Sequence, residues 1–296
     1  MTYTEIGFSS GEDSCSAWHF HAQGENRPAV VMAHGFGGTK DSGLEPFARR
    51  FAAAGFDVVA FDYRGFGASE GAPRQSLSVR KQIDDYHAAI AATQTLPGVD
   101  ASRIALWGVS FSGGHVLRAA AERDDVGAVV ALTPLTSGIA VSRSAAGSRK
   151  IATSLRWTLT GLKSRIAVGR GRAPTMMPLV SPVGGSGALA LDGAYEKYTA
   201  LAGPTWRNEI DSSIGLQVLG VHTTAAAKKL KCPLLVQIAD FDQYVPAGAV
   251  AATAARGRAQ VHHYPCDHFD VWPGNAWFEK TVTDQLTFLT RTLTDQ

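Results

Sequence analysis

The sequence predicts an α/β fold built on a mostly parallel, doubly wound sheet of about eight strands. Short, continuous apolar runs recur along the chain, as is typical of strands buried on both faces, and helix-compatible segments separate them. The alternation lapses from about Pro134 to Ala227, where segments rich in Gly and Pro surround a helical pattern. We therefore expect a sheet core with one inserted segment.

Length and composition exclude several classes of protein. The chain has 296 residues, 45% of them hydrophobic and 18% charged, so it can bury a large core and is not disordered. Its first residues lack a basic and apolar leader, and no apolar run is long enough to span a membrane. We expect a cytoplasmic protein with no membrane span, no disulfide framework from its 3 cysteines and no nucleic-acid partner. The net charge of +2 by itself says little about partners.

The first third of the chain gives the edge of the sheet and two buried strands. Residues 3–8 and 15–21 are expected to form an antiparallel pair, and the apolar run 29–34 leads directly into a glycine-rich loop. Ser42 has capping-box spacing to Glu45, so we expect it to begin the next helix. A second buried strand follows over residues 57–62.

The remaining elements continue the alternation. Further strands are expected at 103–108, 127–132, 233–239 and 259–264, and further helices at 78–95, 116–122, 247–256 and 277–293. We expect residues 1–135 and 228–296 to form the core and residues 136–227 to form a helical cap. Within the cap an amphipathic helix is indicated by apolar residues at spacings of three and four, namely Ile151, Leu155, Leu159, Leu162 and Ile166.

A single serine stands between a strand and a helix near the middle of the chain. Ser110 lies two residues after Gly108 at the end of a strand, and the small residues Ser112, Gly113 and Gly114 come after Phe111. A tight strand-to-helix turn strains the backbone and lifts such a hydroxyl out of the sheet. Ser112 holds the position that is usually glycine in this motif, which is a mild departure because serine is nearly as small.

Nucleophilic acyl transfer needs a hydroxyl, a base, a carboxylate that orients the base, and donors for the oxyanion. Ser110, Asp242 and His268 supply the first three, each following the carboxyl end of an expected strand. Asp240 is the alternative acid.

The order serine, acid, histidine and five loop motifs together resemble the α/β-hydrolase superfamily. The motifs are the segments 34–38, 62–69, 108–114, 242–246 and 268–270. The resemblance runs from near the first strand to the last helix, and its closest parallels are capped bacterial proteins similar to dienelactone hydrolases and acyl-peptidases. It implies that the backbone amides of Phe36 and Phe111 form the oxyanion hole, and it requires no cofactor. The spacing in this family also favours Asp242, four residues before Pro246, over Asp240 as the acid.

Other residues have simpler interpretations. His34 is expected to order the oxyanion loop and His115 to be structural. The group around His262, His263 and Cys266 matches no standard zinc spacing, so we expect no metal. Met176, Met177 and Trp206 are candidates for a hydrophobic acyl pocket under the cap, with Trp157 as a further candidate.

The cap is markedly basic. No acidic residue occurs between Asp125 and Asp192. The basic residues of this stretch are Arg143, Arg149, Lys150, Arg156, Lys163, Arg165, Arg170 and Arg172. Such a run is either a solvated helix face or a surface that attracts an anionic substrate or an acidic surface.

The sequence thus predicts a serine hydrolase that cleaves an ester, thioester or lactone of a small to medium hydrophobic acid. Its partner would be a small-molecule acyl substrate, and a homodimer is compatible with the sequence. Two alternatives remain open: a hydrolase of amide or carbon-carbon bonds that uses the same triad, and a ligand-binding homologue with low turnover.

Overall fold

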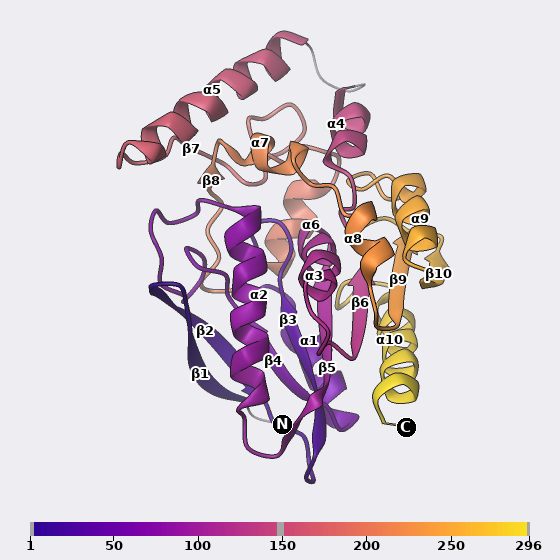
Figure 1. Ribbon diagram of the computed structural model, residues 1–296. Helices are drawn as coiled ribbons and strands as arrows, with labels where there is room; N and C mark the ends of the chain where they lie inside the picture. Colours follow the sequence, from indigo (N-terminus) through magenta and orange to yellow (C-terminus); the bar gives the residue numbers. More distant parts are fainter. Residues whose placement is uncertain (1–2, 147–150, 295–296) are drawn as a thin grey trace.

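The computed structural model describes residues 3–146 and 151–294; of residues 145, 146 and 151–157 it describes the backbone alone. Eight strands form one sheet in the order β1-β2-β4-β3-β5-β6-β9-β10 (Figure 1). β2 runs antiparallel to β1 and β4, and the pairs from β4 to β10 are parallel. The sheet strands are β1 (Tyr3–Ser10), β2 (Asp13–Phe20), β3 (Arg27–Ala33), β4 (Asp57–Phe61), β5 (Val99–Val109), β6 (Ala128–Leu132), β9 (Leu234–Ala239) and β10 (Gln260–Tyr264).

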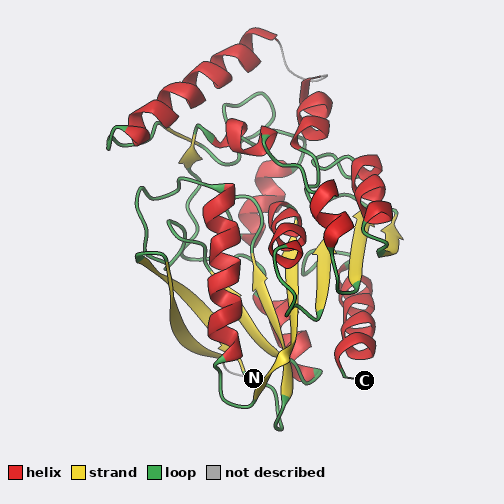
Figure 2. Cartoon of the chain, viewed as in Figure 1, coloured by secondary structure: helices red, strands yellow, loops and turns green. Residues whose placement is uncertain are grey.

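Helices cover both faces of this sheet (Figure 2). α1 and α10 pack together on one face, while α2, α3, α8 and α9 form a contiguous layer on the other. The core helices are α1 (Glu45–Ala53), α2 (Val79–Gln94), α3 (Phe111–Ala121), α8 (Thr224–Lys229), α9 (Ala247–Arg256) and α10 (Phe278–Leu293). The predicted doubly wound, mostly parallel sheet is confirmed.

The central strand β5 is tied to both helix layers. Trp107 is fully buried, and its indole N–H donates to the Gln285 side chain of α10 at 3.0 Å. Its backbone carbonyl accepts a hydrogen bond from the Tyr86 hydroxyl of α2 at 2.9 Å. Each polar group of these large rings therefore has a partner, which keeps their burial favourable.

Two local predictions were wrong. α1 begins at Glu45 behind Leu44, which makes no side-chain cap, and the Ser42 hydroxyl instead lies 2.8 Å from the Thr39 hydroxyl. α3 begins at Phe111 rather than at Val116. The pair Gly113-Gly114 resembles loop sequence, but both glycines lie in the first turn of α3. Glycine is needed there because the backbone packs closely against neighbouring segments.

Between β6 and β9 the chain forms further helices and one small antiparallel pair of strands, β7 and β8, above the carboxyl ends of the sheet strands (Figure 1). These elements are α4 (Gly138–Ala146), α5 (Ile151–Gly169), β7 (Met176–Met177), α6 (Ala194–Leu201), β8 (Ile210–Asp211) and α7 (Ile214–Leu219). α8 follows them and packs against α3 and α9, so it adjoins the core. The division at residues 136 and 227 stays a prediction.

The long helix α5 docks through small residues rather than through its apolar stripe. A Cβ added at Gly161 would lie 2.8 Å from the Ser212 carbonyl oxygen, and the Ser164 hydroxyl donates to Asp211 at 2.6 Å. The stripe residues whose side chains are described point outward: Leu159, Leu162 and Ile166 are 51%, 48% and 46% exposed. Ile151 and Leu155 lie outside the described side chains.

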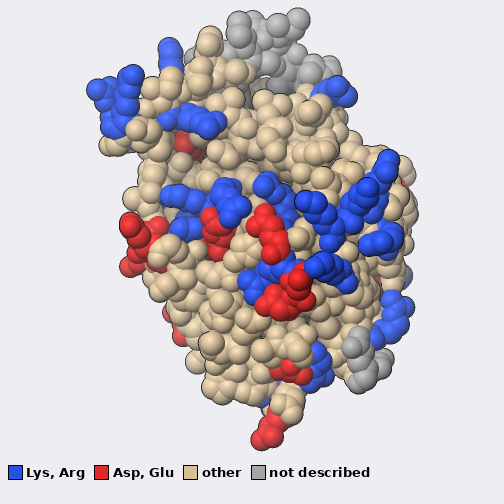
Figure 3. Space-filling model, in the orientation of Figure 1, with Lys and Arg blue, Asp and Glu red and all other residues tan. Residues whose placement is uncertain are grey.

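Basic side chains accompany this exposed helix. Lys163, Arg165, Arg170 and Arg172 are all exposed, as is Arg143 on α4. Figure 3 shows Lys and Arg side chains gathered at the far end of α5 with uncharged surface beside them. The side chains of Arg149, Lys150 and Arg156 lie outside the described part of the chain.

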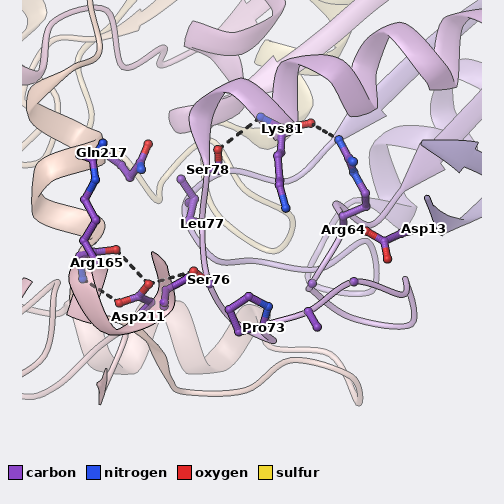
Figure 4. A pocket seen from close by; sticks show the side chains of 15 residues that line it. Asp13, Arg64, Pro73, Ser76, Leu77, Ser78, Lys81, Arg165, Asp211 and Gln217 are labelled. Carbon is purple, nitrogen blue, oxygen red and sulfur yellow. Dashed lines mark hydrogen bonds between the residues drawn. The ribbon is translucent and has the colours of Figure 1, made fainter. Parts of the chain in front are cut away.

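One buried carboxylate joins the cap to the core. Asp211 is 2% exposed and accepts hydrogen bonds from the backbone N–H and hydroxyl of Ser213, both at 2.9 Å. It also accepts from Ser164 of α5 at 2.6 Å. A further bond of 2.9 Å comes from Ser76, in the loop before α2, and Figure 4 shows the Ser76 and Asp211 side chains together. These bonds replace the hydration that the carboxylate loses on burial. A cavity of about 190 Å³ lies beside this junction.

Replacing Asp211 by alanine leaves four donors without this acceptor, so we expect the free energy of unfolding to fall by about 2–4 kcal/mol. Urea unfolding measures this loss, and limited proteolysis should cut the cap of the variant faster. Asp192→Ala, which alters an exposed carboxylate of the cap, is the control and should change stability by less than about 0.5 kcal/mol. Equal stability of the two variants would contradict this role of Asp211.

Candidate active site

The turn between β5 and α3 holds Ser110 in a strained conformation. Its φ is 57° and its ψ is −114°, values that non-glycine residues rarely adopt. The turn is tight because a Cβ at Gly108 would lie 2.4 Å from the Ser112 carbonyl oxygen, and one at Gly114 would lie 2.3 Å from the Leu135 carbonyl oxygen. Backbone packing therefore requires glycine at positions 108 and 114, on either side of the turn.

Neighbouring serines have other roles. The buried Ser112 hydroxyl accepts from the Val109 amide at 2.8 Å and lies 2.9 Å from the Ala33 carbonyl oxygen, to which it donates. Ser69 is likewise buried, and its hydroxyl donates to the Asp62 carbonyl at 2.6 Å. Both hydroxyls stabilise backbone, which supports Ser110 as the candidate nucleophile.

Asp242 and His268 meet directly beyond the ends of β9 and β10. The Nδ1 atom of His268 lies 2.6 Å from Oδ2 of Asp242, and both side chains are almost fully buried. The other Asp242 oxygen accepts from the amides of Tyr244 and Val245, each at 2.7 Å. Since a carboxylate only accepts, His268 donates from Nδ1, and its Nε2 is left to act as a base.

The rival acid and the neighbouring histidines pair elsewhere. Asp240 lies 2.6 Å from Nδ1 of His263 in a half-exposed pair, and Nδ1 of His262 lies 3.1 Å from Asp284. Burial raises the pKa of the Cys266 thiol to about 12. His262 and His263 thus pair with different carboxylates, and the Cys266 side chain is buried.

The loop after β3 lies against Ser110. A Cβ at Gly35 would lie 3.1 Å from Cβ of Ser110 and 2.9 Å from the Val109 carbonyl oxygen, so only glycine fits at this approach. The ring of Phe36 packs edge-to-face on Phe111 with centroids 5.8 Å apart. The predicted oxyanion residues are therefore neighbours, and the Phe111 amide stands at the N-terminus of α3, where the helix dipole favours negative charge.

His34 connects the same loop to the histidine loop. Its ring stacks on Trp272, with centroids 5.1 Å apart, and a Cβ at Gly38 would overlap it at 1.8 Å. Burial lowers the pKa of His34 to about 4. Burial likewise lowers the pKa of His115 to about 3, and its Nε2 lies 2.8 Å from the Gln82 side chain. Both imidazoles are neutral parts of the fold.

Helix α6 contacts two of these loops, and no sequence motif indicated these contacts. The Tyr198 hydroxyl donates to the Phe36 carbonyl at 2.5 Å, and Lys197 donates to Asp267 at 3.2 Å, beside His268. Asp267 in turn accepts from the Gln243 amide at 3.2 Å, next to Asp242. One cap helix thus contacts the oxyanion loop and the histidine loop.

The predicted acyl-pocket residues differ in their surroundings. Trp206 packs beside Tyr198, with ring centroids 5.5 Å apart, and Met177 is partly buried against the core. Met176 is 36% exposed on β7. The side chain of Trp157 lies outside the described residues.

A possible metal-binding group lies at the opposite end of the sheet. The ligand atoms of His19, His21 and Asp57 lie within 4.8 Å of one another. Asp57, however, already pairs with the Arg27 guanidinium and with His19, and these hydrogen bonds lower its pKa despite burial. Asp57 is therefore a buried carboxylate whose charge Arg27 and His19 stabilise, and this pairing explains why the group lies together.

The parallel sheet, the strained serine and the loops at its carboxyl edge define an α/β-hydrolase. Residues 24–266 match the family model described as "Serine aminopeptidase, S33", and the chain belongs to this family of hydrolases. Among the residues that the structure describes, none of the helices is sufficiently long and apolar to cross a membrane.

Individual relatives extend the comparison. The chain is 35% identical over 97% of its length, and 94% of the relative's, to quorum-quenching protein AidA of Acinetobacter baumannii (strain MDR-ZJ06). It is 34% identical over 62% of its length, and 57% of the relative's, to thiohydrolase aneE of Aspergillus aculeatus. In fold it is similar to the α/β hydrolase GrgF of Penicillium sp. sh18, with a TM-score of 0.83, 24% identity and coverage of 99% of both chains.

The neutral, buried His34 makes stability depend on pH. In the unfolded chain an imidazole takes up a proton near its ordinary pKa of about 6.5, whereas folded His34 stays neutral down to about pH 4. The unfolded state binds more protons in this interval, so stability is fully present above about pH 6.5 and falls below it, with His34 contributing about 2 kcal/mol of the loss at pH 5. Urea unfolding above about pH 6.5 and at about pH 5 measures this loss of stability. The loss should be smaller in His34→Gln and unchanged in His222→Gln, which alters an exposed residue. Equal pH dependence in wild type and His34→Gln would contradict the account.

Proposed function

We propose that this protein is a serine hydrolase that cleaves an ester, thioester or lactone of a small to medium hydrophobic acid through a covalent acyl-enzyme. The observation that carries the proposal is the buried hydrogen bond of 2.6 Å between His268 and Asp242. Such a bond orients an imidazole for general-base catalysis, and Ser110 stands on a strained turn at the same edge of the sheet.

In the proposed mechanism, His268 takes the proton from the Ser110 hydroxyl while the serine oxygen attacks the acyl carbonyl carbon. The amides of Phe36 and Phe111 donate to the oxyanion of the tetrahedral intermediate. His268 then returns the proton to the leaving oxygen or sulfur, and water releases the acid by the same steps in reverse. Asp242 holds the tautomer and stabilises the imidazolium throughout.

The names of the relatives support this substrate range. One is a quorum-quenching protein and another a thiohydrolase, and both exceed 30% identity. We propose Met177 and Trp206, with Met176 at the margin, as the apolar lining for the acyl chain. Lys163, Arg170 and Arg172 are exposed, whereas Arg165 lines the cavity beside Asp211, so any attraction of the first three for an anionic substrate would act at long range.

A panel of substrates tests the proposal. We expect turnover of p-nitrophenyl esters, acyl thioesters or lactones by the wild type, and a fall in kcat of about 10⁴-fold or more in Ser110→Ala. Ser69→Ala is the matched control, because it removes a buried hydroxyl outside the nucleophile turn that donates to the backbone carbonyl of Asp62. It should lose stability but keep its kcat within about tenfold.

The panel also separates the alternatives. Turnover of amides or β-diketones alone would replace ester cleavage by the amide or carbon-carbon reaction. Undiminished turnover in Ser110→Ala would contradict the proposed nucleophile.

The two candidate acids offer a second test. Asp242→Asn should lower kcat by about 10⁴-fold, because an amide in its place favours the wrong tautomer of His268. Asp240→Asn, which alters a carboxylate paired with His263 on the surface, should leave kcat unchanged. Steady-state kinetics on a substrate from the panel measures both, and the reverse ranking would make Asp240 the acid.

Tyr198 is proposed as a positioning residue for the oxyanion loop. In Tyr198→Phe the Phe36 carbonyl loses its hydrogen bond, so the adjacent amide is held less firmly. We expect kcat to fall about fivefold to tenfold with little change in KM. Tyr195→Phe, on the exposed side of the same helix, is the control. If both variants behaved alike, or if KM alone rose, Tyr198 would have no role in positioning the oxyanion donors.

A further inference from the structure

Helix α5 presents an apolar face that no described part of this chain covers. Among the α5 positions whose burial the structure describes, Gly161 and Ser164 are buried and Val168 is half-buried. All three face the rest of the cap. By helical periodicity the opposite side carries Leu159, Leu162 and Ile166. Each of these is about half exposed. We call these three residues the outer face of α5.

An exposed stripe of this kind is unusual for a soluble helix. Helices of globular proteins normally turn their apolar stripe toward the core, and a contiguous exposed apolar patch marks an interaction surface. Here the docking side is defined by specific contacts, the Gly161 approach to Ser212 and the bond from Ser164 to Asp211. The outward direction of the stripe is therefore built into the packing of the helix.

The charges around the outer face indicate what it contacts. Lys163 falls beside the apolar stripe, and Arg170 and Arg172 follow at the end of the helix. Arg165 lies toward the docking side, where it lines the cavity beside Asp211 (Figure 4). All four side chains are exposed. The sequence has no acidic residue from 126 to 191 to offset them. Two copies of this chain meeting through the outer face would bring these like charges together, which opposes self-association.

An anionic bilayer satisfies both features of the surface. Leucine and isoleucine side chains enter the boundary between headgroups and acyl chains, while flanking lysines and arginines meet lipid phosphates. We propose that the outer face of α5 docks this protein on anionic lipid membranes. The proposal goes beyond the hydrolytic function and does not depend on which acyl bond is cleaved.

Vesicle sedimentation tests the proposal with the intact protein and without any turnover. We expect wild type to bind vesicles of phosphatidylcholine with phosphatidylglycerol, to bind pure phosphatidylcholine about tenfold more weakly, and to dissociate as salt is raised. In the variant L159Q/L162Q/I166Q the new residues still favour a helix. It should bind the anionic vesicles at least about tenfold more weakly than wild type does. V261Q, at an equally apolar but distant position on β10 that is 37% exposed, is the matched control and should bind as wild type does.

Three outcomes would overturn the proposal. Failure of the wild type to bind anionic vesicles is one, and equal binding of the wild type and the triple variant is another. The third is a dimer, seen by light scattering, that the triple variant converts to a monomer, since the outer face would then be an interface between copies. Circular dichroism and ester turnover of the triple variant, expected to match wild type, distinguish loss of docking from loss of the fold or of the active site.

Discussion

The close packing of the β5–α3 turn against the loop after β3 is the constraint on which the site depends. A serine with φ of 57° persists only where its surroundings enforce that conformation. Here the enforcement comes from backbone approaches that exclude any Cβ at Gly35 and Gly108, and from the Ser112 hydroxyl, which joins the turn to β3. The strain at Ser110 is therefore offset by the hydrogen bonds and packing of the central strands, the most deeply buried part of the fold.

The cap is coupled to this site through helix α6. α6 donates to the Phe36 carbonyl through Tyr198 and reaches the histidine loop through Lys197. Other cap segments bond to the core at the Asp211 junction to the loop before α2 and at the Asp41 side chain, which accepts from the Thr205 amide. Because α6 is attached to the two loops directly, any displacement of this helix would move the oxyanion loop and the histidine loop together.

Much of the architecture could be predicted from the sequence because its signals are local. Buried parallel strands appear as apolar runs, and the strand-to-helix turn at Ser110 is recognised from small residues at fixed spacing. The chosen acid agrees with the observed bond from His268 to Asp242. The start of α3 was misplaced because Gly113 and Gly114 are poor helix formers, and their presence reflects tertiary packing that local propensity does not contain.

Other features could not be predicted because they depend on direction rather than pattern. The periodicity of α5 predicts a helix with an apolar stripe, but a pattern does not reveal that Gly161 and Ser164 form its docking side. Tyr198 is a single tyrosine in a short helix, and only the three-dimensional arrangement brings its hydroxyl to a loop 162 residues away in sequence. Asp211 lacks any motif, although it joins three separate segments.

The central claim is that Ser110 is an activated nucleophile, and covalent labelling tests it most directly. The protein would be treated with a fluorophosphonate, and the modified residue identified by intact mass and peptide mapping. The account predicts one adduct, on Ser110, that forms in wild type and is absent from Ser110→Ala. An adduct on another serine, or none in a folded wild-type protein, would contradict the account.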